Sequence, residues 1–180
     1  MQEPRLTPIS FIVLGLVRWA GEATPYQLKQ IVAASVGNFW TLQHAQLYSE
    51  PERLAEAGYL TEQRERGGRR RKVYSITDKG RRALDEWRSE PTDAIPELRA
   101  PALLKLFFGA DPAELAPIQV EAHKRKLAEY EEIRATMPES VPEGPRLALD
   151  AGIASERQQI EWWEAVMVSP DGDRSRAPAR

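Results

Sequence analysis

The 180-residue chain contains no cysteine and only two histidines, His44 and His123. The absence of cysteine excludes disulfide frameworks, cysteine zinc sites and thiol nucleophiles. Two histidines do not favour a histidine-rich metal site. The sequence also lacks a nucleophile–base pair and a glycine-rich phosphate loop, so we expect no metal, no cofactor and no enzymatic activity.

Long apolar runs are scarce. The run near the N-terminus, Ile9 to Val17, is too short to span a bilayer, and Arg18 follows it directly. It also lacks the basic leader and the small-residue cleavage pattern of a signal peptide. We therefore expect a soluble cytoplasmic protein without a membrane partner.

Net charge is close to neutral, but its distribution along the chain is uneven. Residues 1–90 carry 14 Lys/Arg and 11 Asp/Glu, whereas residues 91–180 carry 11 and 16. Six of the basic residues of the first half fall in residues 64–72. This local cluster could bind a polyanion, although a charge run is more often only a solvated face.

Three helices are predicted in the first 60 residues. Ile9–Trp19 is apolar on nearly all sides, and Thr24-Pro25 has the cap and first-turn proline of a second helix that runs to about Ala34. A third helix is predicted from near Thr41 to Gly58. Pro51 lies within it, so we expect a kink or break there.

Two β-prone segments, residues 59–63 and 72–76, follow the third helix and flank Gly67-Gly68, which predicts a hairpin. Thr77-Asp78 then predicts a fourth helix, with Ala83, Leu84 and Trp87 turned inward. Three helices, a two-stranded β-wing and a further helix are typical of a winged helix-turn-helix domain. We assign residues 1–90 to this domain.

The second half of the chain is predicted to be helical. After a proline-rich connection at 89–101, we expect helices over residues 102–108, 112–137 and 146–168, with Pro138, Pro142 and Pro145 breaking the chain between the last two. The last helix carries an apolar seam at heptad-like spacing, which suits a partner helix. We therefore expect a mainly α protein with a long-helix dimerisation domain at 91–168 and a disordered tail at 169–180. The candidate dimerisation residues are Leu149, Ile153, Ile160, Trp163 and Met167.

Two groups of side chains could contact DNA. The start of the third helix offers amide, imidazole and hydroxyl groups that can bond to base edges or phosphates: Thr41, Gln43, His44, Gln46 and Tyr48. The predicted wing supplies positive charge for phosphate contacts: Arg69, Arg70, Arg71 and Lys72.

Four motifs, in this order, resemble the PadR family of bacterial transcription regulators. They are an apolar opening with a helix start, a third-helix motif, a wing with the helix that follows it, and an apolar C-terminal pair. In this chain the first motif is residues 9–16 with Thr24-Pro25-Tyr26, and the second is residues 44–48 with Arg53-Leu54 and 58–60. The third is residues 68–74 with 76–81, and the fourth is residues 103–108 with Trp162-Trp163.

The resemblance implies a homodimer held by its C-terminal helices, repression at a palindromic operator in double-stranded DNA, and often induction by a small molecule. It also implies that Tyr48 contacts the DNA backbone and that Arg70 and Lys72 are basic wing positions. Pro51 departs from the apolar residue expected at that place. Phenolic acids and other hydrophobic compounds are the effectors that the resemblance suggests, bound where the two domains meet, but the effector-binding residues remain unknown.

Some alternatives stay open at this point. Tyr48 could pack against the first helix, and Trp162 and Trp163 are more often core or interface residues than ligand-stacking groups. The whole chain could be a winged-helix protein-interaction module that does not bind DNA.

Overall fold

The computed structural model describes residues 4–64, 71–95 and 99–168. Contacts divide the chain into two compact units, residues 1–94 and 95–180. Within the described ranges, no helix combines the length and the apolarity needed to cross a membrane.

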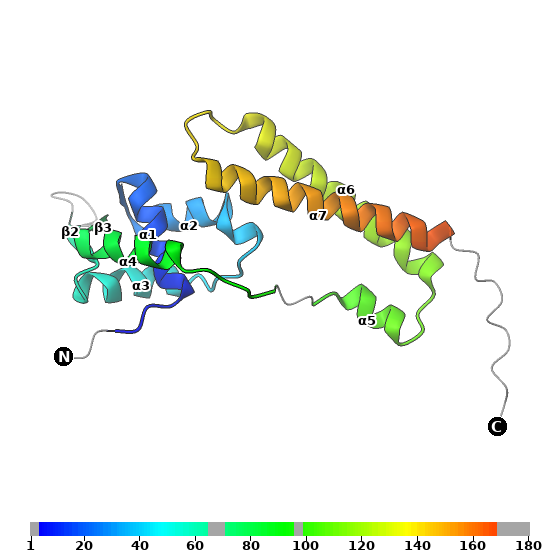
Figure 1. Ribbon diagram of the computed structural model, residues 1–180, viewed down its shortest axis with the longest axis horizontal. Coiled ribbons are helices and arrows are strands. Elements are labelled where there is room, and N and C mark those ends of the chain that lie inside the picture. The colour runs from blue at the N-terminus through cyan, green and yellow to red at the C-terminus, as the bar shows by residue number, and fades with distance from the viewer. Residues whose placement is uncertain (1–3, 65–70, 96–98, 169–180) are drawn as a thin grey trace, which may run out of the picture. The chain divides into compact units, whose positions relative to one another are not determined.

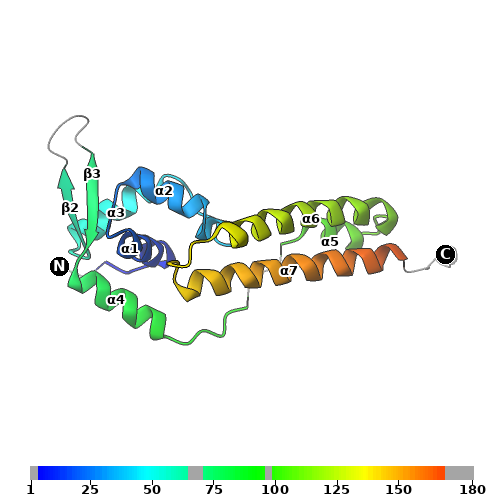
Figure 2. The same cartoon turned by 90° about the horizontal axis from the view of Figure 1, so that it is seen from above.

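The first unit is a winged helix, as the sequence predicts (Figure 1). Its strands form one antiparallel sheet in the order β1-β3-β2, so the wing hairpin of β2 and β3 gains a short third strand, β1, that the sequence analysis missed. Figure 2 shows β2 and β3 side by side. The elements are α1 (Pro8–Ala20), β1 (Glu22–Ala23), α2 (Pro25–Ala33), the 3₁₀ helix η1 (Val36–Asn38), α3 (Gln46–Glu56), β2 (Leu60–Arg64), β3 (Lys72–Ile76) and α4 (Asp78–Ser89).

Two of the predicted helix starts are confirmed by their capping bonds. At α2, the backbone N–H of Gln27 donates to Thr24 Oγ1 over 3.3 Å, and the side chain of Gln27 accepts from the Thr24 N–H over 2.9 Å. At α4, Thr77 Oγ1 accepts from the Gly80 N–H over 3.1 Å. These bonds satisfy donors that the first turn of a helix otherwise leaves unpaired.

The third helix departs from the prediction at its start. It begins at Gln46 rather than near Thr41, because a tight turn precedes it. In that turn the Gln46 N–H donates to the Gln43 carbonyl over 3.0 Å, while Gln46 Oε1 accepts from the Gln43 N–H over 3.2 Å. The predicted break at Pro51 was wrong, since α3 continues through it to Glu56 and the buried proline ring packs into the core.

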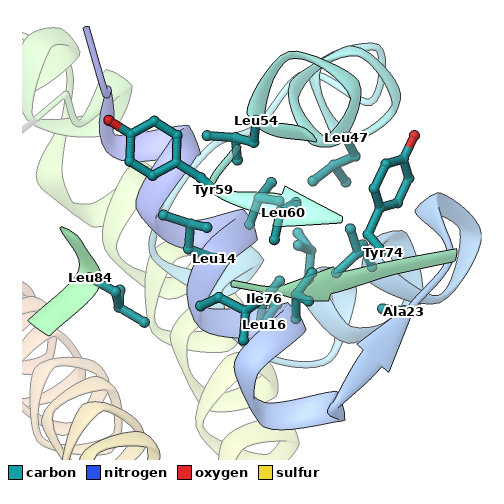
Figure 3. Packing of buried hydrophobic residues seen from close by; sticks show 14 residues of the cluster. Leu14, Leu16, Ala23, Leu47, Leu54, Tyr59, Leu60, Tyr74, Ile76 and Leu84 are labelled. Carbon is teal, nitrogen blue, oxygen red and sulfur yellow. The ribbon is translucent and has the colours of Figure 1, made fainter. Parts of the chain in front are cut away.

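Helix α1 runs through the middle of the first core (Figure 3). Val13, Leu14 and Val17 are fully buried there, against leucines of α3 and the apolar residues of β2 and β3. Trp87 is not turned into this core as expected. It stays 42% exposed and stacks on Phe11 with ring centroids 4.6 Å apart, whereas Leu84 of the same helix is buried in the core.

The second unit consists of α5 (Pro101–Phe107), α6 (Pro112–Thr136) and α7 (Glu143–Val168). Figures 1 and 2 both show α6 and α7 lying along each other. Helix α7 begins at Glu143, three residues earlier than predicted, and Pro145 lies in its first turn instead of breaking the chain. A proline is tolerated there because the first-turn N–H groups have no partner within the helix.

Candidate nucleic-acid interface

The five predicted recognition side chains lie at one end of α3. Thr41 and Gln43 belong to the connection before the helix, His44 to its leading turn, and Gln46 and Tyr48 to its first turn. All five are exposed. Tyr48 is 48% exposed, so packing against the first helix does not remove it from solvent. The segment thus presents amide, imidazole and hydroxyl groups to the outside.

An open hollow of about 250 Å³ lies beside this segment. Residues of α2, η1, α3 and the connection between η1 and α3 line it, including Lys29 of α2 and Trp40, Thr41 and His44 of the connection. The lining combines apolar surface with one ammonium group and one imidazole. The hollow therefore places a concave surface and the ammonium group of Lys29 on the face where the predicted DNA-contacting residues lie.

The orientation of α3 is fixed by its inner face. Leu47, Pro51 and Leu54 are buried in the first core. Glu50 is also buried, and its Oε1 accepts from Ser10 Oγ of α1 and from Arg53, each over 2.6 Å. The hydrogen bond to Glu50 raises the pKa of Arg53 despite the opposing effect of burial. This buried charge network joins α3 to the start of α1, which holds the outer face of α3 in one direction.

The outer face of α3 also carries polar residues that the sequence analysis missed, among them Ser49 and Glu52. Both are exposed. The signal was present in the sequence, because a 3.6-residue period anchored on Leu47 and Leu54 places positions 49 and 52 opposite the core.

Only part of the predicted basic wing falls within the described residues. Arg69 and Arg70 lie outside them, whereas Arg71 is exposed directly before β3. Lys72, the first residue of β3, has its ammonium nitrogen 2.6 Å from Glu52 Oε1 and 3.2 Å from Glu62 Oε2. Lys72 therefore joins β3 to α3 through Glu52 and to β2 through Glu62, which the sequence did not predict.

At the root of the wing, hydrogen bonds and ion pairs link Glu52, Glu62, Lys72 and Tyr74. The buried Tyr74 hydroxyl donates to Glu62 Oε2 over 3.1 Å. Hydrogen bonds to Glu52 and then Glu62 raise the pKa of Lys72. For Glu62, desolvation opposes ionisation, but hydrogen bonds from Lys72 and Tyr74 outweigh it and lower the pKa. Burial, followed by the charge of Glu62, raises the pKa of Tyr74.

The predicted dimerisation seam lies largely inside its own unit. Trp163 is 1% exposed in a cluster with Ala102, Ala116 and Val120, and Ile160 packs against this cluster. Ile153 is also buried, Leu149 is partly buried, and Met167 is 40% exposed. As expected for neighbours on a helix, Trp162 points in a different direction from Trp163 and is much more exposed, although the two rings are in edge contact with centroids 4.8 Å apart.

Other apolar side chains of the second unit are the ones that face solvent. The sequence signal was the apolar segment 102–108, which has too few polar residues to cover an outer face. The exposed large apolar residues of these three helices are Leu104, Phe107, Ile118, Leu147, Trp162 and Met167, and Phe108 follows α5 directly.

Among the described residues, no group of three or more histidine or carboxylate side chains is placed to hold a metal ion. The arrangement on the first unit is suited to binding: exposed hydrogen-bonding groups on a rigid helix, with a cationic β-hairpin beside it.

Comparison with known families matches both units. Residues 13–86 match the transcriptional regulator PadR-like family, and residues 98–168 match the virulence activator alpha C-term family. The negative transcriptional regulator PadR of Bacillus subtilis is 28% identical over 183 residues, covering 92% of this chain and 98% of that protein.

Solved structures agree with these matches. Bacillus subtilis PadR in complex with operator DNA superposes with a TM-score of 0.79 at 25% identity, covering 89% of this chain and 98% of that one. The same protein with p-coumaric acid gives 0.76 at 24% identity, covering 94% and 100%. The Vibrio cholerae virulence activator AphA gives 0.67 at 30% identity, covering 88% of this chain and 95% of that one.

Proposed function

Because this chain belongs to the PadR-like family of transcriptional regulators, we propose that it is a sequence-specific DNA-binding repressor that acts as a dimer on a palindromic operator. The observation that carries the proposal is the exposed polar start of α3, held rigid by the buried Glu50–Arg53–Ser10 network. The operator complex of the Bacillus subtilis relative supports the same use of the fold.

Sequence recognition is assigned to the turn that leads into α3. A helix that points its N-terminal end into the major groove brings the residues of that end to the base edges. Gln43 and His44 are exposed there, and a glutamine amide can form a bidentate pair with adenine. Tyr48, further along the helix, is assigned to the phosphate backbone, as the family resemblance implies.

Affinity that does not depend on sequence is assigned to the wing. Arg71 is exposed at the start of β3, and Arg69 and Arg70 precede it in the chain. Arginine contacts to phosphate release counterions, so this part of the binding free energy weakens as salt increases. The wing is expected to hold the protein on DNA without choosing the site.

Dimer formation is assigned to the second unit. Leu104 and Phe107 of α5 are 60% and 82% exposed, and Trp162 of α7 is also exposed. Apolar surface of this kind on one unit favours association with a second copy. A two-fold dimer presents two copies of α3, which explains why the operator should be palindromic.

Release from DNA is assigned to a small phenolic or otherwise hydrophobic effector. The support is likeness to the Bacillus subtilis relative, which has been solved with p-coumaric acid. p-Coumarate is therefore the first compound to test against the complex of this protein with its operator.

The proposal is tested by selecting genomic fragments that the purified protein binds, searching them for a palindrome, and measuring affinity for that operator and for a scrambled duplex. Gln43→Ala should weaken operator binding about tenfold or more, because one bidentate base pair contact is worth roughly 1–3 kcal/mol, and should leave scrambled DNA nearly unchanged. Tyr48→Phe should weaken both duplexes alike.

Two results would contradict the proposal. If Gln43→Ala costs the same on both duplexes, the turn before α3 does not recognise sequence. If the wild-type protein shows no salt-sensitive binding to any duplex, the chain is a protein-interaction module instead.

Activation of transcription is the second candidate, favoured by the match of residues 98–168 to the virulence activator family and by the 30% identity to AphA. A reporter gene under the selected operator distinguishes the two. Deleting the gene for this protein should raise reporter expression if it is a repressor and lower expression if it is an activator.

A further inference from the structure

Lys72 is the wing cation that sequence and resemblance assign to DNA phosphate, yet its ammonium group already has two carboxylate partners. Glu52 of α3 lies 2.6 Å away, and Glu62 of β2 lies 3.2 Å away. We propose that Glu52 is an affinity-determining residue that competes with DNA phosphate for Lys72 and so weakens binding to DNA of any sequence. This inference rests on the proposed function.

The charges at the root of the wing explain why the competition matters. An ammonium group has three donors, and two of them point at carboxylates here. Glu62 also pairs with Arg64 over 3.5 Å, so Lys72 and Arg64 together balance Glu52 and Glu62. This neutral group does not attract phosphate as an isolated lysine would. A cation that is already neutralised also releases fewer condensed counterions when it meets DNA.

The two carboxylates differ in how readily they can give up Lys72. Glu62 is fixed by the buried Tyr74 hydroxyl at 3.1 Å, and its side chain is 25% exposed. The Glu52 side chain is 49% exposed and projects from the outer face of α3, the surface proposed to meet DNA. Glu52 is therefore the partner that an incoming phosphate would displace, and it would then stand as an unpaired negative charge beside the DNA.

The test is the substitution Glu52→Gln, which keeps side-chain size and removes the charge. Binding to a random duplex is measured by fluorescence anisotropy between 50 and 300 mM salt. We expect the affinity at the lowest salt to rise about fivefold and the salt slope to steepen by roughly 0.9, the value for one added phosphate contact. A thermal melt of each variant verifies that the fold is retained.

Glu56→Gln is the matched control. Position 56 is exposed, lies on the same helix face one turn beyond Glu52, and loses the same charge. Its effect on affinity therefore measures general electrostatics alone. The second control is Glu52→Gln in a Lys72→Met background. There the gain in DNA affinity should shrink to that of Glu56→Gln, because the lysine for which Glu52 and phosphate compete is absent.

The DNA affinities of these variants either support or overturn the role of Glu52. A gain in affinity and slope that exceeds that of Glu56→Gln and depends on Lys72 supports the proposal. An effect equal to that of Glu56→Gln, or weaker binding, overturns it while the proposed function stands, because wild-type protein still binds DNA. Absence of salt-sensitive binding by wild-type protein overturns both.

Discussion

The two units of this chain bury their apolar residues to different degrees. In the first unit, helices and strands enclose a single core around α1, where Val13, Leu14 and Val17 have no exposure to solvent. In the second unit, Trp163 fills a small cluster with two alanines and a valine. There, Phe107 remains 82% exposed.

This difference separates two tasks. The first unit also has exposed aromatic residues, such as Trp19 and Phe39, but its closed core allows it to present polar groups in fixed positions, as the outer face of α3 requires. The long helices of the second unit leave apolar residues exposed, and these residues become buried when the unit packs against another protein surface. The charge distribution agrees, since residues 1–90 have more basic than acidic residues and residues 91–180 the reverse.

Substitution of Trp163 should have the largest effect on the difference between the two units. Trp163→Ala should destabilise the second unit by roughly 3–5 kcal/mol, the usual cost of truncating a buried large aromatic. Hydrogen exchange followed by mass spectrometry should show faster exchange in α6 and α7 and unchanged protection in α1. Equal loss of protection in both units would mean that they fold as one and that the contrast between them is wrong.

In the first unit, the matching weak point is the buried charge network of α3. Arg53→Ala leaves the buried Glu50 without its cation. Because the Arg53 side chain is 35% exposed and solvent screens part of the attraction, we expect a loss of roughly 1–3 kcal/mol. Urea denaturation measures it. Arg88→Ala, which removes an exposed ion pair with Asp85, should cost well under 1 kcal/mol. Similar losses in the two variants would contradict the role of the network.

The exposed apolar residues of the second unit allow a more local test. Phe107→Ser should weaken dimerisation about tenfold or more, because burial of one phenylalanine side chain contributes roughly 1.5–3 kcal/mol. Analytical ultracentrifugation over a concentration series measures the dissociation constant. Trp19→Ser, at a residue 53% exposed on the first unit, should leave it unchanged. A wild-type protein that stays monomeric at micromolar concentration would rule out the dimer itself.

The smallest expected effect compares one tyrosine in each unit. Burial raises the pKa of both Tyr74 and Tyr130, so both should remain protonated above pH ~10, where exposed tyrosines ionise. Because the unfolded chain loses these protons first, stability should fall as pH rises beyond that value. Ultraviolet titration should show fewer phenolates than tyrosines until the protein unfolds. Simultaneous ionisation of all five tyrosines would contradict this.

The sequence predicted those features that depend on neighbouring residues. The caps at Thr24 and Thr77 were predicted correctly because capping bonds join residues three apart. Strand β3 was predicted with its observed bounds, and the apolar C-terminal helices were found by their periodicity.

Features that depend on distant contacts were missed. The start of α3 is set by a tight turn at Gln43, and continuation through Pro51 is supported by tertiary burial that local propensity does not encode. The partners of Lys72 come from residues 10 and 20 positions earlier in the chain. The contacts that bury Trp163 within its own unit were not predicted, because periodicity identifies an apolar face without identifying what covers it. The dimerisation role of the seam stays a prediction.

The short strand β1 constrains how this protein can vary in length during evolution. Ala23 pairs with Tyr74 in the central strand β3, and Thr24, the cap of α2, follows Ala23 directly. A residue inserted within β3 would turn Tyr74 to the opposite face of the sheet and would also shift the ladder that anchors the start of α2. Insertions between residues 64 and 72 shift neither ladder. Relatives should therefore differ in length in that segment while keeping β3 at constant length, so that the reach of the wing evolves independently of the helices beside it.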